Sequence, residues 1–209
     1  YFGIKTGFNE AFIIDTKTRD GILANCKTQE ERKRTEEIIK PILRGRDIGR
    51  YYYKWAGLWV IKIESGWTNK NRRNEKPEEF FKKMSPSIYR HLISFANKEV
   101  EGSRKGLLNR DDQGDYWWEL RNCAYYPEFE KEKIVWQEIV REPSFAYDNT
   151  GIYCEATSFL MTGKNLKYII GLLNSKPVMF FFRNYYAGGG LGEEGYRYKK
   201  AFLKQLPLP

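Results

Sequence analysis

The densest group of acidic residues in the sequence lies between positions 111 and 119, and such a group can hold a metal ion. It consists of Asp111, Asp112, Asp115 and Glu119. Carboxylate oxygens are ligands of Mg²⁺, and metal-dependent nucleases use the ion to activate water against a phosphate ester. The neighbouring Arg110 and Arg121 offer these carboxylates ordinary ion pairs instead. The sequence therefore leaves two interpretations open here, a metal-dependent nuclease site and a solvated acidic loop.

A second acidic candidate is Asp15-Thr16-Lys17, with Glu10 upstream. It follows residues 11–15, whose apolar and β-branched composition predicts a short strand. The alternative is an ordinary turn at the end of that strand.

Other catalytic motifs are absent from the sequence. It contains no Gly-rich loop ending in Lys and Ser or Thr, no HExxH and no GxSxG. His91 is the only histidine, and a packed or surface residue is the simpler interpretation of it. The three cysteines, Cys26, Cys123 and Cys154, lie far apart, which disfavours a disulfide framework or a zinc site and favours the reducing cytoplasm. We therefore expect no catalytic residue, metal or cofactor in this chain.

Basic residues carry the main functional signal. The chain has 36 Lys and Arg against 27 Asp and Glu, a net charge of +9. Residues 27–105 hold 20 basic and 11 acidic groups, whereas residues 106–209 hold 13 of each. A charge excess confined to one stretch indicates a polyanionic partner, with a solvated basic face as the alternative.

The candidate contacts to such a partner lie mainly between positions 44 and 74. They are Arg44, Arg46, Arg50, Lys54, Lys62, Lys70, Arg72, Arg73, Asn74, Arg110 and Gln113. Most of the cations would bind phosphates, while an Arg fork can pair with guanine and an Asn or Gln amide with adenine. The run Tyr51-Tyr52-Tyr53 inside this basic sequence offers rings that stack on bases, or that are half-buried in a strand.

These residues must be positioned by an α+β fold. The length of 209 residues and the 41% hydrophobic content fit a single domain, with residues 27–105 as its basic part and 106–209 as its balanced part. Strands are predicted over residues 11–15, 51–55, 58–64, 134–140, 144–148 and 152–155, and helices over 28–40, from 85, over 166–173 and after 175. We expect hairpins at 51–64 and 144–155, forming a curved or mixed sheet with helices packed on it and long basic loops. No apolar run is long enough to span a membrane, and the start at Tyr1 indicates a fragment of a longer protein.

Six segments, taken in order, resemble a known family. They are IKTGFNEAFIID (residues 4–15), IKPILRGRDI (39–48), DQG with WWELR (112–121), FEK with KIV (129–131 and 133–135), LKYIIGLLNS (166–175) and LPLP (206–209). Together they resemble the TaqI-like C-terminal specificity domain of type IIG restriction–modification enzymes and adenine-N6 DNA methyltransferases. Glu132 departs from the pattern, since the family often has Pro there. The Asn-Pro-Pro-aromatic motif of adenine methyltransferases and a PD-(D/E)xK nuclease set are missing.

The resemblance implies a target-recognition domain that clamps double-stranded DNA and selects a site for a methyltransferase domain upstream in the same chain. It implies S-adenosylmethionine, and Mg²⁺ where a nuclease is present, as cofactors of the parent protein rather than of this fragment. The blocks are shared by members with different targets, so we expect them to be scaffold and expect residues 62–76 and 98–113 to read bases. The alternatives are a metal-dependent nuclease domain and an RNA-binding module, although no RRM signature is present.

Overall fold

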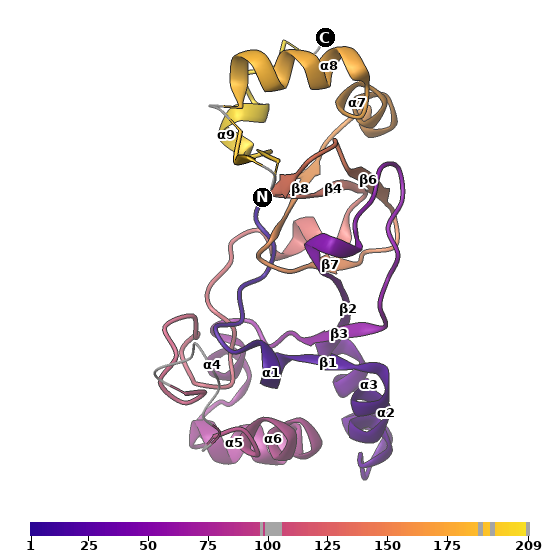
Figure 1. Cartoon of the computed structure of the whole chain (residues 1–209). Helices are drawn as coiled ribbons and strands as arrows, with labels where there is room; N and C mark the ends of the chain where they lie inside the picture. Colours follow the sequence, from indigo (N-terminus) through magenta and orange to yellow (C-terminus); the bar gives the residue numbers. More distant parts are fainter. Residues whose placement is uncertain (97, 99–105, 188–189, 193–194, 208–209) are drawn as a thin grey trace. The chain divides into compact units, whose positions relative to one another are not determined.

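The structure is a computed structural model that describes residues 1–96, 98, 106–187, 190–192 and 195–207 (Figure 1). The predicted α+β class is confirmed: short sheets and short helices alternate along the chain. The chain forms two compact units. The first comprises residues 1–4, 42–56 and 125–209, and the second comprises residues 5–41 and 57–124.

The first unit is built on a three-stranded antiparallel sheet. Strand β4 (Lys133–Gln137) lies in the middle, between β6 (Phe145–Asp148) and β8 (Ser158–Thr162). Two smaller pairings complete the strands of this unit: β5 (Ile139–Val140) with β9 (Tyr196–Arg197), and β7 (Tyr153–Cys154) in parallel with the last two residues of β2 (Ile39–Leu43). All residues of β4 except Gln137 are buried, as expected of a central strand.

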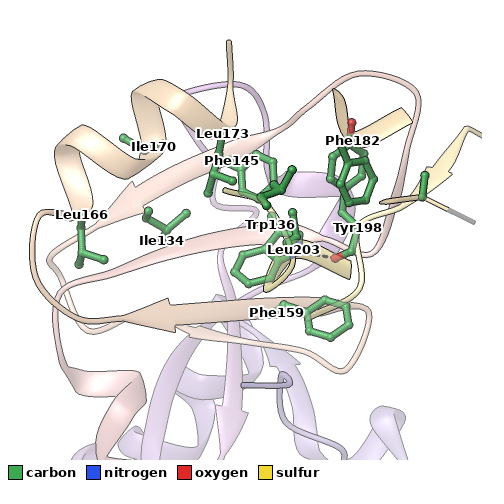
Figure 2. Packing of buried hydrophobic residues seen from close by; sticks show 12 residues of the cluster. Ile134, Trp136, Phe145, Phe159, Leu166, Ile170, Leu173, Phe182, Tyr198 and Leu203 are labelled. Atoms are coloured by element: carbon green, nitrogen blue, oxygen red, sulfur yellow. Dashed lines mark hydrogen bonds between the residues drawn. The ribbon is translucent and has the colours of Figure 1, made fainter. Parts of the chain in front are cut away.

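Six short helices complete the described part of this unit. They are η1 (Gly45–Asp47), η2 (Tyr126–Glu130), α7 (Leu166–Leu173), α8 (Lys176–Phe181), the π-helical turn η3 (Phe182–Tyr186) and α9 (Lys200–Leu203). Of these, α7, η3 and α9 contribute buried residues to the core of the unit. Figure 2 shows Leu166, Ile170 and Leu173 of α7 facing the sheet, which is the apolar stripe expected at helical spacing. The indole Nε1 of Trp136 donates to the Tyr198 carbonyl at 2.8 Å, so this polar atom is satisfied inside the core.

The second unit is built on β3 (Leu58–Ile61), which lies between β1 (Ile13–Asp15) and β2 in an antiparallel arrangement. Its helices are α1 (Asn9–Phe12), α2 (Thr16–Ala24), α3 (Gln29–Ile38), α4 (Trp67–Asn71), α5 (Pro77–Met84) and α6 (Pro86–Ile93). Stacked rings, such as Phe81 on Trp118 at 5.1 Å between centroids, fill much of its core.

Several predicted helix starts are confirmed by side-chain caps. The Thr28 hydroxyl accepts from the Glu31 N–H at 3.1 Å, and Ser175 caps α8 by accepting from the Val178 N–H at 3.3 Å. Proline at the first turn begins α5 and α6, as predicted for residue 86.

Both predicted hairpins are wrong in their pairing. Residues 51–55 form only one bridge, from Tyr53 to Ile48, while β3 pairs with β1 and β2. Strand β6 pairs with β4, and β7 pairs with β2, so the two do not form the hairpin expected at 144–155. An alternating apolar pattern indicates that a segment is half-buried, but it does not specify which strand lies beside it.

The strand predicted over residues 11–15 is shorter than expected, because Ala11 and Phe12 close the single turn of α1 and only β1 is extended. None of the helices in the described part of the chain has the length and apolar character needed to cross a membrane.

Candidate nucleic-acid interface

The first candidate surface is the arginine loop, residues 44–56 of the first unit. At its start the Arg44 guanidinium forms two hydrogen bonds with the Asp47 carboxylate, at 2.7 and 3.0 Å. Burial acts to raise the pKa of Asp47, but the hydrogen bonds from Arg44 outweigh it and hold that pKa below its ordinary value. Arg44 is therefore an anchor of the loop.

The tip of the arginine loop is held by backbone and side-chain bonds to β6 and its surroundings. The Tyr51 N–H donates to the Phe145 carbonyl at 2.8 Å, and Arg50 Nη2 donates to the Asn174 carbonyl at 2.8 Å. The Tyr53 hydroxyl donates to Asp148 Oδ1, also at 2.8 Å. These bonds run to elements far away in sequence, so the loop conformation is fixed by tertiary contacts.

Asp148 itself belongs to a fully buried ion pair with Lys133. Burial acts to raise the pKa of Asp148, but hydrogen bonds from Lys133, Thr150 and Tyr53 outweigh it and lower the pKa. A carboxylate with a lowered pKa stabilises the fold above its unfolded-state pKa, and this contribution is lost as the pH falls through the folded-state value. The support of the loop is thus intact at neutral pH.

Several side chains of the arginine loop face water, whereas Ile48 is buried. Arg46 and Lys54 are exposed, and so are the rings of Tyr51, Tyr52 and Trp55. The loop therefore presents cations beside aromatic faces, the combination that binds a phosphate backbone and its bases.

The second candidate surface is the α4 segment, residues 65–76 of the second unit. The Glu119 carboxylate is fully buried beneath it and accepts three backbone N–H groups, from Gly66 at 3.0 Å, Thr68 at 2.8 Å and Asp115 at 3.0 Å. Two of these donors belong to the otherwise unpaired first turn of α4. Glu119 thereby fixes the start of this helix.

Asn69 is held from three sides on the same helix. Its amide donates to Asp115 Oδ2 at 2.7 Å, and its oxygen accepts from the Tyr116 hydroxyl at 2.7 Å and from Arg72 Nε at 2.9 Å. Arg72 also donates to the Glu75 carbonyl at 2.9 Å. Asn69 and Arg72 are therefore engaged in keeping the α4 segment in shape.

Three predicted contacts of the α4 segment are exposed: Lys70, Arg73 and Asn74. Arg73 has a φ of 52°, in the left-handed region, which turns the chain sharply after α4. Lys62, just before the segment, is mostly buried and pairs with Glu64 at 2.8 Å.

Arg110 and Gln113 both belong to the second unit. Arg110 is 3% exposed, donates to the carbonyls of Thr6, Leu107, Trp117 and Glu119, and stacks over the Phe12 ring. Burial lowers the pKa of Arg110 to about 10. Gln113 bridges to Leu120 and its Oε1 is buried. Tertiary packing encloses Arg110 and keeps its guanidinium from an external phosphate, whereas Gln113 is only half-buried.

Three of the acidic candidates for a metal site have other partners in the fold. Asp15 caps α2 by accepting from the Thr18 N–H at 2.7 Å, Asp112 pairs with Arg121 at 3.1 Å, and Glu119 supports α4. No three His, Cys, Asp or Glu side chains gather around a possible metal position among the residues that the structure describes. His91 shares a hydrogen bond with the Ala11 carbonyl at 2.9 Å, and burial lowers its pKa.

The predicted reading region 98–113 is only partly described, since residues 99–105 lie outside the described residues. The supporting role of Glu119 was missed at the sequence level, because its partners lie about fifty positions earlier in the chain. The left-handed backbone of Tyr51, whose φ is 71°, was missed as well. The preceding Gly49 and Arg50 are only a weak indication of a tight turn there.

Comparisons with known proteins agree on one group of relatives. A family model described as the TaqI-like C-terminal specificity domain matches residues 40–208. A curated relative is the Type II methyltransferase M.MjaIV of Methanocaldococcus jannaschii. The two sequences are 26% identical over an alignment of 215 residues, which covers 99% of this chain. A solved chain of the Type IIL restriction–modification enzyme MmeI, determined in complex with DNA, is similar with a TM-score of 0.58 and 12% identity over 97% of this chain.

The relatives are longer than this chain. It spans 63% of the length of the methyltransferase and 24% of the length of the solved enzyme chain. The likeness to the solved chain establishes a shared fold.

Proposed function

The chain belongs to the TaqI-like C-terminal specificity domain family, as its sequence blocks predicted, and from this premise we propose that its two exposed basic segments contact double-stranded DNA. Domains of this family recognise the DNA target of a restriction–modification enzyme. The observation that carries the proposal is the presence of exposed cations on two segments that buried carboxylates support from within, Asp148 and Glu119.

The proposed contacts are a subset of the residues selected from the sequence. They are Arg46, Arg50, Lys54, Lys70, Arg73 and Asn74. The cations would bind phosphates and set the register of the duplex, and the amide of Asn74 is suited to a base edge. The other selected residues would stabilise the scaffold that presents these contacts. They are Arg44, Lys62, Arg72, Arg110 and Gln113.

The parent protein would be an adenine-N6 methyltransferase, with or without an endonuclease. Its methyltransferase domain would precede this chain, bind S-adenosylmethionine and act on a flipped adenine. This proposal rests on the methyltransferase relative, of which this chain spans 63%. The free thiols of Cys26, Cys123 and Cys154 fit a location in the cytoplasm.

The test is a titration of the whole chain against a random-sequence DNA duplex at several salt concentrations, with an RNA duplex of the same length for comparison. We expect DNA to be preferred and the slope of log K against log salt to be about −4 to −6, because each neutralised phosphate contributes about −0.9. Binding without a salt slope would contradict the proposal, and a preference for RNA would favour an RNA-binding module.

Two double variants, each of which removes two positive charges, test which basic residues contact the DNA. Replacing Arg46 and Lys54 together by Ala should make the slope shallower by about 1.8. Lys82 and Lys83 of α5 pair with the carboxylates of Glu79 and Glu75. Replacing these two lysines together by Ala should leave the salt slope unchanged. Equal effects of the two double variants would mean that the basic residues act only through net charge.

A further inference from the structure

We propose, on the premise that the chain binds DNA, that Tyr51 and Tyr52 form an aromatic wedge that enters the duplex and unstacks a base step. Exposed rings at the tip of a cationic loop can either lie along the sugar–phosphate backbone or insert between bases. Three features of the arginine loop favour insertion.

The first feature is the backbone of Tyr51, whose φ is 71°. Turns place Gly or Asn at such positions because a side chain in the left-handed region is crowded, and a bulky aromatic residue there is an outlier. The conformation is held from outside by the bond from the Tyr51 N–H to the Phe145 carbonyl at 2.8 Å, and across the turn by the bond from the Gly49 N–H to the Tyr52 carbonyl, also at 2.8 Å. Strain of this kind is characteristic of functional sites.

The second feature is the exposure of the two rings. Tyr51 is 52% and Tyr52 is 64% exposed, although each could cover a large apolar area on contact. A Cβ atom at position 49 would lie 2.6 Å from Cζ of Tyr52, so the glycine allows this ring to lie close against the turn. The wedge is therefore preorganised before any partner arrives, which lowers the entropic cost of binding.

The third feature is the charge around the rings. The Arg50 guanidinium carbon lies 5.4 Å from the centre of the Tyr51 ring, and Lys54 follows on the same loop. The only acidic residue between positions 44 and 56 is Asp47, which Arg44 neutralises. Positive charge around the rings favours a polyanion, whose bases can stack on them. It disfavours an apolar protein surface as the partner.

Insertion of such a wedge unstacks a base step, which costs free energy. The additional contacts that the wedge makes with the DNA must offset this cost. That cost is smaller where the step already contains a mismatched pair. The aromatic wedge therefore predicts a preference for mismatched DNA, whereas rings lying along the backbone predict none.

The experiment measures binding of the whole chain to two random-sequence duplexes that differ by one central mismatch. The test variant combines Tyr51→Gly with Tyr52→Ala. Glycine suits the left-handed backbone at position 51, so this variant should melt no earlier than the wild type. The control is Tyr185→Ala, which removes a 69% exposed tyrosine from the helical turn η3 of the same unit.

We expect the wild type and Tyr185→Ala to bind the mismatched duplex about 5- to 10-fold more tightly than the matched one, in the lower part of the range measured for stacking of one base on an aromatic ring. The wedge variant should bind both duplexes equally while keeping the salt slope, since its cations remain. Salt-dependent binding without a mismatch preference in the wild type, or a preference that survives in the wedge variant, would overturn the inference but not the proposed function. Loss of all salt-dependent binding in the wild type would overturn both.

Discussion

Glu119 shows how a single buried carboxylate positions a candidate DNA contact without touching the DNA. It is fully buried and receives three backbone N–H groups, two of them from the first turn of α4. The sequence offered it as a metal ligand, yet in the fold it is a cap for a distant helix. The same carboxylate chemistry serves both uses, and only the neighbouring groups distinguish them.

Replacement of Glu119 by Gln is the residue-scale prediction. The amide nitrogen cannot accept the N–H groups, so one or more buried donors are left unsatisfied. We expect the free energy of unfolding, measured by urea titration, to fall by about 2–4 kcal/mol. The control is Glu36→Gln, which breaks the exposed pair with Arg32 and should change the free energy by less than about 0.5 kcal/mol. Equal losses would show that the Glu119 carboxylate has no special role.

At the scale of elements, the arginine loop combines anchoring residues with presented ones. Arg44 binds Asp47 within the loop, and Tyr53 and the Tyr51 N–H bind to β6. The side chains of Arg46, Tyr52 and Lys54 face water instead. The alternation follows from the short η1 turn and the bridge between Ile48 and Tyr53, which direct neighbouring side chains to different sides. Basic residues adjacent in sequence therefore have different roles.

The prediction for this element compares Arg44→Ala with Arg46→Ala, since both remove one positive charge from the same loop. Arg44→Ala should lower the free energy of unfolding by about 1 kcal/mol and leave the salt slope of DNA binding unchanged, because its charge is already paired. Arg46→Ala should leave stability unchanged and make the slope shallower by about 0.9. Urea titration and binding titrations measure the two quantities. Similar behaviour of the two variants would contradict the division into anchor and contact.

At the scale of the whole molecule, the chain passes between its two units four times, after residues 4, 41, 56 and 124. Neither unit is a continuous segment. The excess of positive charge, which the sequence concentrates in residues 27–105, is shared between the units: the first carries 15 basic and 10 acidic residues, and the second carries 21 and 17. Each unit therefore has its own net positive charge.

This arrangement predicts that the chain cannot be divided at one point. A fragment of residues 57–124 lacks β1 and β2, the two strands that flank β3, so β3 would lose its backbone partners. We expect this fragment to be unfolded by circular dichroism and amide exchange, and the whole chain to be folded. A fragment with native-like protection of β3 would contradict this view of the second unit.

The class of fold, the starts of several helices, the family and the stretch that carries the excess of positive charge could all be read from the sequence. These features depend on local chemistry: a hydroxyl caps a helix at Thr28 or Ser175, and apolar residues at helical spacing place one face of α7 inward. Ordered sequence blocks likewise identify a family without any knowledge of contacts.

Strand pairing and the exposure of each cation depend instead on long-range packing. Strand patterns indicate burial but not the neighbour, so the predicted hairpins were wrong. Arg110 and Arg46 look alike in sequence, yet one is enclosed by four carbonyls while the other faces water. The physical reason is that an arginine takes its role from groups that long-range packing brings to it, and no local pattern encodes those groups.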